Sequence, residues 1–115
     1  MKRNPLPETV SVLGVPFRVL IVDEVDDQDS SGETCGEHRH IKIASSQDTR
    51  RRWTTFALHE YLHAALVING VHSVLGEELE EVIVQSLEHA LEQLLLTHGK
   101  QLLAALAVQK EDIND

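Results

Sequence analysis

The sequence predicts an α+β fold in which a small sheet packs on two longer helices. The first part of the chain, up to Ala44, contains short stretches rich in β-branched residues. From Thr49 onward the apolar residues recur with helical spacing, and Ser45–Asp48 between the two parts supplies helix N-cap chemistry. With 115 residues the chain fits a single domain, residues 1–115, in which 1–7 and 111–115 are expected to be loose tails.

Three strands are expected in the first part. Thr9–Leu13 and Phe17–Val22 read as two strands joined by a turn at Gly14–Pro16. Asp23–Gly36 is acidic and rich in Ser and Gly, which predicts a long surface loop. His38–Ala44 alternates polar and apolar residues and reads as the third strand of a small antiparallel or mixed sheet.

The second part predicts helices. The first runs from about Thr49 to Val67 and ends at Asn69-Gly70, and Val71–Gly76 is expected to be a linker. A second helix covers about Glu77–Thr97 and has one apolar stripe that is expected to be buried, namely Ile83, Leu87, Ala90, Leu91 and Leu94.

Beyond the second helix, Gly99 is a candidate C-cap. Lys100–Lys110 reads as a third, short helix, and the residues after it are expected to fray.

Composition narrows the possible functions. The net charge of −9 argues against a nucleic-acid partner, which would require a basic face. No apolar run approaches the roughly 18 residues that span a bilayer, and Met1–Arg3 is not followed by a signal-peptide core, so no membrane partner and no export are expected. Cys35 is the single cysteine, which excludes an internal disulfide and fits a reducing cytoplasm.

The most informative feature is His59-Glu60-Tyr61-Leu62-His63, which reads H-E-x-x-H inside a predicted helix. Residues four apart lie on one face of a helix, so both imidazoles can reach one metal ion. The glutamate between them lies beside that metal and can take a proton from a bound water. Zinc needs a third protein ligand, and the acidic start of the second helix, Glu77–Glu81, offers candidates.

The segment Thr55–Ala64 resembles the active-site helix of zincin metallopeptidases, and the acidic helix that follows makes the chain similar to their gluzincin group. More closely, the chain resembles small zinc-peptidase-like proteins of phages and bacteria. The shared order is a Gly/Cys loop, an Ile-x-Ile strand, an "HELLHA"-like helix and a helix with two glutamates before apolar residues. In this chain these are Gly32–Gly36, Ile41–Ile43, His59–Ala64 and Glu80–Ile83, so the resemblance covers roughly residues 30–97.

The resemblance implies a minimal zincin-like fold and Zn²⁺ held by His59, His63 and a downstream glutamate, with a water as fourth ligand. It implies that Glu60 is the general base and that the protein hydrolyses peptide bonds. It further implies that an edge strand, here Ile41–Ile43, pairs with an extended substrate. The protein would then act in the cytoplasm of a bacterium, or in a virion if a phage encodes it.

The third ligand is predicted to be Glu81, with Glu80 as the alternative and Glu77 as an outsider. On a helical wheel Glu80 falls on the apolar stripe, whereas Glu81 lies about 100° further round, at its border. In thermolysin-like helices the ligand glutamate is followed by small or polar residues at the third and fourth positions after it, and Glu81 meets this only at the fourth, Gln85. The small family also tends to place a glutamate six residues before a buried leucine, which here is Leu87.

A second function has the same site but no catalysis. The chain is short for a protease and lacks the extra lobe that usually completes a substrate cleft. The metal would then be structural, in an interaction protein or a phage virion component whose partner is another protein. A metal-free acidic binding module is a third reading.

A second metal site is possible at Cys35, His38 and His40, although loop histidines are also common without a metal. His72, His89 and His98 are expected to lie on solvated surfaces. The oligomeric state is left open.

Overall fold

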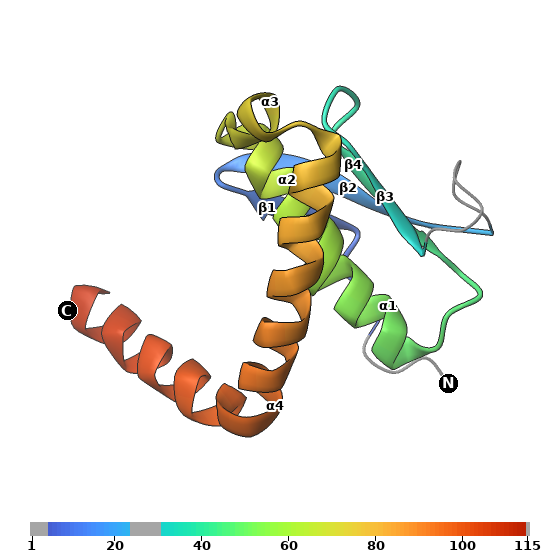
Figure 1. Cartoon of the computed structure of the whole chain (residues 1–115). Helices are drawn as coiled ribbons and strands as arrows, with labels where there is room; N and C mark the ends of the chain where they lie inside the picture. The colour runs from blue at the N-terminus through green and yellow to red at the C-terminus, as the bar shows by residue number, and fades with distance from the viewer. Residues whose placement is uncertain (1–4, 24–30, 115) are drawn as a thin grey trace.

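The computed structural model describes residues 5–23 and 31–114, and side chains up to Val108. The predicted α+β class is confirmed, because a four-stranded mixed sheet packs against helices (Figure 1). The strands are β1 (Thr9–Val12), β2 (Val15–Val22), β3 (Gly32–Cys35) and β4 (His40–Ala44). Their order in the sheet is β1-β2-β4-β3.

The first two strands form an antiparallel hairpin with Val12 opposite Val15. Leu13 and Gly14 make the two-residue turn, and both have positive φ angles, 50° and 86°. Positive φ at both turn positions matches the twist of a tight hairpin. The turn therefore lies earlier than the predicted Gly14–Pro16, and Pro16 belongs to β2.

The middle of the sheet is parallel and its far edge is antiparallel. β4 pairs in parallel with β2, with Val19 opposite Ile41, and in antiparallel with β3. Two expectations are corrected here. The predicted loop at Asp23–Gly36 contains strand β3, and Ile41–Ile43 lies in an interior strand, so within the described residues the edge strand next to β4 is β3. Residues 24–30 of that loop, with most of its acidic cluster, lie outside the described residues.

The predicted first helix is one continuous rod in three parts. These are α1 (Thr49–Thr55), a π-helical turn η1 (Phe56–Glu60) and α2 (Tyr61–Ile68). Asp48 caps the start of the rod, because its side chain accepts a hydrogen bond of 2.8 Å from the backbone N–H of Arg51. The Tyr61 N–H donates to the Phe56 carbonyl, which is the i to i+5 hydrogen bond that defines a π turn.

The C-terminal part differs from the prediction. The expected linker contains a short helix, α3 (Val71–Leu75), and a single helix, α4 (Glu77–Asn114), takes the place of the two predicted ones. Gly99 lies inside α4 and does not cap it, and the helix continues into the predicted tail as far as Asn114. In Figure 1 α4 bends where its colour turns from orange to red, and its last part points away from the sheet.

The core lies between the sheet and the rod, and valine, isoleucine and phenylalanine dominate it. Its buried members are Val12, Phe17, Val19, Ile41, Ile43, Phe56 and Ala64. Trp53 packs on this core and makes an edge-to-face contact with Phe56. The predicted buried stripe of α4 is wrong in large part, since Leu87, Ala90 and Leu94 are exposed in the single chain.

Helix α4 lies against η1, α2 and α3, on the side of the rod that also faces β3. Among the described residues, the helices are all too short or too polar to cross a bilayer.

Candidate metal centre

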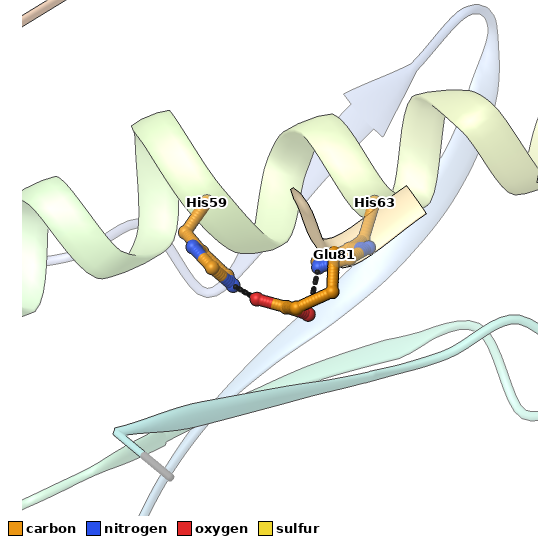
Figure 2. A group of neighbouring side chains, drawn as sticks. All are labelled: His59, His63 and Glu81. Atoms are coloured by element: carbon orange, nitrogen blue, oxygen red, sulfur yellow. Dashed lines mark hydrogen bonds and ion pairs between the residues drawn. The ribbon is translucent and has the colours of Figure 1, made fainter. Parts of the chain in front are cut away.

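The two histidines of the H-E-x-x-H motif lie side by side on the rod. His59 belongs to the π turn and His63 to α2, and their ring centroids are 5.0 Å apart. Both side chains are largely buried. Figure 2 shows their rings pointing to the same side of the rod, toward Glu81.

Glu81 reaches both rings from α4. Its Oε1 lies 2.9 Å from Nε2 of His59, and its Oε2 lies 3.0 Å from Nε2 of His63 (Figure 2). One ligand atom from each of these three residues lies within 4.8 Å of the other two. In the described part of the chain this is the single group of three potential ligands that close together.

The other nitrogen of each ring also meets a carboxylate. Nδ1 of His59 lies 2.7 Å from Oε1 of Glu88, and Nδ1 of His63 lies 2.5 Å from Oε2 of Glu80. If each Nδ1–H donates to its carboxylate, the ring's tautomer is fixed and the Nε2 lone pair is left for a metal. Carboxylates that orient histidine ligands in this way are common around metal ions in proteins.

This arrangement fits a cation. With Nδ1 protonated, both neutral rings direct an Nε2 lone pair at the Glu81 carboxylate, which is unfavourable unless the rings gain a second proton or a metal lies between them. Two imidazoles and a carboxylate are the donor set that zinc takes in catalytic sites, where the fourth position is left to water. The residues present therefore fit Zn²⁺.

Glu80 and Glu81 have different surroundings, although they are neighbours in α4. Glu80 is 3% exposed and its carboxylate lies between two rings, since Oε1 is 2.7 Å from Nδ1 of His72. The side chain of Glu81 is 44% exposed. Glu80 meets His63 at Nδ1, on the other side of the ring from the Nε2 atom that Glu81 approaches. Of the two glutamates, Glu81 is thus the one whose carboxylate lies near both Nε2 atoms and could complete a metal site.

Glu60 lies beside the group but is not part of it. It is 5% exposed, and its Oε2 is 3.9 Å from Nε2 of His59. The Thr34 hydroxyl, on β3, is 2.7 Å from Oε1 of Glu60 and 3.0 Å from its backbone oxygen. Burial raises the pKa of the Glu60 carboxyl, while the Thr34 hydrogen bond and the two histidines act in the opposite direction.

The π turn sets the direction of Glu60. A Cβ added to Gly32 would lie 2.9 Å from Cγ2 of Thr55 and 3.0 Å from Cγ of Glu60, so both side chains face the same point of β3. Five residues of a regular α-helix rotate the side chain by about 140° and could not bring Thr55 and Glu60 to one face. The i to i+5 turn removes that divergence.

These groups line a cavity of about 1070 Å³ between β3 and α4, with the rod as its floor. Ser31–Thr34 line one wall, and Glu77, Glu80, Glu81, Gln85 and Glu88 line the other. His72 and His89 also border it. His89 is exposed on α4, as expected, whereas His72 is half-buried and pairs with Glu80, so the expectation of a solvated surface is wrong for His72.

The remaining candidates lie apart from the metal group. Cys35 is a free thiol and the rings of His38 and His40 stack on each other, but these three do not bring their ligand atoms together as His59, His63 and Glu81 do. His98 is exposed and pairs with Gln101. Glu77 lines the cavity without joining the three ligand atoms.

Sequence reasoning missed Thr34, Gly32, His72 and Glu88. The sequence signal for them is weak, because they come from a strand that was predicted as loop, a helix that was predicted as linker and a position on α4 that has no motif.

No family model, curated protein or solved structure matches this chain. The function must therefore be argued from the geometry of the site.

Proposed function

We propose that the protein is a zinc-dependent hydrolase of peptide bonds, with His59, His63 and Glu81 as metal ligands and Glu60 as general base. The observation that carries the proposal is the paired orientation of the two rings. Both Nε2 atoms face one carboxylate, while both Nδ1 atoms face others, Glu80 and Glu88. Histidine rings with a carboxylate at each nitrogen are expected at a metal site. Without a cation between them, burying these carboxylates beside neutral rings is energetically unfavourable.

When bound, zinc would polarise a substrate carbonyl and lower the pKa of a water molecule. The role of Glu60 is to accept the proton of that water and to pass it to the leaving amine. Its burial favours this role, because a carboxylate with a raised pKa is a stronger base. Thr34 holds Oε1 of Glu60, and Oε2 is the oxygen nearer His59 and the ligand group.

The substrate class follows from the edge strand. Ser31 accepts a backbone hydrogen bond from Ala44, so in the alternating antiparallel ladder the backbone groups of Gly32 and Thr34 face away from β4. These groups border the cavity that holds the proposed metal ligands. An extended peptide can pair with this open edge, which would place its carbonyl groups beside Glu60. The role that the sequence assigned to Ile41–Ile43 thus passes to β3.

The experiment compares Glu60→Gln with the wild-type protein after both are loaded with one equivalent of zinc. Glu60 is proposed as base and not as ligand, so zinc content should be unchanged while hydrolysis of a mixed peptide library falls by at least about a hundredfold. Glu78→Gln, on the exposed side of α4, is the matched control and should keep full activity.

A second function shares the metal site. If the zinc-loaded wild-type protein leaves every peptide intact, the site is structural and the protein is a silent zinc-binding partner of another protein, such as a virion component. If Glu60→Gln loses its zinc, Glu60 is a ligand and the assignment of roles is wrong.

A further inference from the structure

The C-terminal part of α4 extends beyond the domain. We call residues Leu94–Val108 the arm. The helix contacts η1, α2 and α3, while the red part of α4 in Figure 1 projects away from the sheet and from α1. A helix without tertiary contacts is marginal in water, because most helical stability in proteins comes from packing an apolar face.

The arm is unusually apolar for an exposed helix. Leu96 and Leu103, which are seven residues apart, are 71% and 66% exposed. The other large exposed apolar side chains of the arm are Leu94, Leu95, Leu102, Leu106 and Val108. Contiguous exposed apolar surface of this kind indicates an interaction site.

The apolar face of the arm continues the face that α4 packs on the domain. Val84 is fully buried and Leu91 is half-buried against the rest of the chain. Leu95, Leu102 and Leu106 follow Leu91 at spacings of four, seven and four residues. At about 100° per residue these four positions fall within an arc of roughly 60° on the helix, so one apolar stripe continues where the domain ends.

The charge of α4 changes at the same point. Its first part contains six glutamates between Glu77 and Glu92, whereas the arm contains Lys100 as its single Lys, Arg, Asp or Glu residue. Two copies of a protein with a net charge of −9 repel each other over most of their surface. The arm is a stretch on which this repulsion is small, so it suits contact between copies.

We propose that the arm is a dimerisation surface whose occupant is the arm of a second copy of this chain. The apolar side chains of two paired arms would bury on the order of 1,000 Å², close to the lower end of the range for stable protein interfaces. A two-fold axis would place the same leucine stripe on both sides and close the assembly at two chains. This inference is independent of the proposed metal chemistry.

The test measures the mass of the full chain by sedimentation equilibrium from low micromolar to submillimolar concentration. The wild-type protein should form a dimer. Leu102→Gln combined with Leu106→Gln, both on the stripe, should raise the dimer dissociation constant on the order of a hundredfold, because two apolar contacts per arm are lost. Glutamine is a good helix former, so circular dichroism should show the same helix content.

The matched control is Val74→Gln combined with Leu79→Gln. These side chains are 84% and 51% exposed and lie on α3 and at the start of α4, outside the arm. The control should dimerise as the wild-type protein does. A wild-type monomer at every concentration, an assembly larger than two chains, or an unchanged dimer in the arm variant would each overturn the proposal.

Discussion

Glu80 and Glu81 illustrate how one residue of helix separates two roles. Neighbouring side chains on a helix point about 100° apart. Glu80 points into the protein, where it joins His63 to His72, and Glu81 points across the cavity to both Nε2 atoms. The proposed zinc ligand and the proposed orienting residue therefore come from adjacent positions.

The first prediction separates these roles by zinc affinity. Glu81→Ala should weaken zinc binding most, because it removes a ligand. Glu80→Gln should weaken it by roughly tenfold to a hundredfold, since His63 loses the acceptor that orients its ring. Glu78→Ala is the control and should bind zinc as the wild-type protein does. Competition with a chromophoric chelator measures all three, and a greater loss for Glu80→Gln than for Glu81→Ala would exchange the two assignments.

The sequence indicates most clearly the part of the site that lies within one helix. His59, Glu60 and His63 form a recognisable pattern because helical spacing alone brings them together. Thr34, Glu88 and His72 reach the site from β3, α4 and α3, so their role depends on how these elements pack. The choice between Glu80 and Glu81 also depends on the rotation of α4, which a wheel drawn from the sequence cannot provide.

At the scale of elements, strand β3 is the main difference between expectation and structure. Gly32–Cys35 contains a glycine and polar residues, which predict a loop. The glycine is required because the rod passes so close that a side chain at position 32 would meet Thr55 and Glu60. Gly32, which in the sequence predicts a flexible loop, thus marks a place where the strand and the rod pack closely.

The second prediction contrasts two glycines. Gly32→Ala should destabilise the protein by about 1–3 kcal/mol and lower any hydrolysis, because its Cβ would displace Thr55 and Glu60 or strain the Lys42 backbone. Gly99→Ala should stabilise it by about 0.5–1 kcal/mol, since Gly99 lies inside α4 with no contact below 3.9 Å. Urea unfolding of each variant at low protein concentration measures both. Equal effects of the same sign would contradict the close approach of β3 to the rod.

At the scale of the whole molecule, the fold class was predictable and the layout was not. The hairpin, the strand at Ile41–Ile43 and the two main helices follow from local periodicity. The parallel pairing of β2 with β4 and the single long α4 depend on contacts between distant parts of the chain. The predicted burial of the apolar stripe on α4 was wrong for a related reason. The sequence shows that a helix face is apolar, but it does not show which other element covers that face.

The third prediction concerns the stability of the whole domain. The proposed ligand group His59, His63 and Glu81 joins the rod to α4, and Glu60, Glu80 and Glu88 add further carboxylates around it. If zinc binds the folded protein as proposed, it reduces the repulsion among these carboxylates and should raise the melting temperature. At a zinc concentration about a hundred times the dissociation constant, the gain corresponds to roughly 2.7 kcal/mol.

Thermal unfolding with zinc and with excess EDTA provides the measurement. His59→Ala is the control, and its melting temperature should respond little to either addition. If the melting temperature of the wild-type protein is the same in zinc and in EDTA, the proposal that this site binds zinc is wrong.

The five-residue turn in the middle of the rod limits how this site could be transplanted. Copied onto a straight α-helix of another scaffold, the letters H-E-x-x-H would still place two imidazoles one turn apart. The glutamate between them would lose its alignment with the residue five positions earlier, because here the extra residue in the turn brings Glu60 and Thr55 together against Gly32. A designer would have to copy the irregular turn and the bare strand opposite it together with the motif.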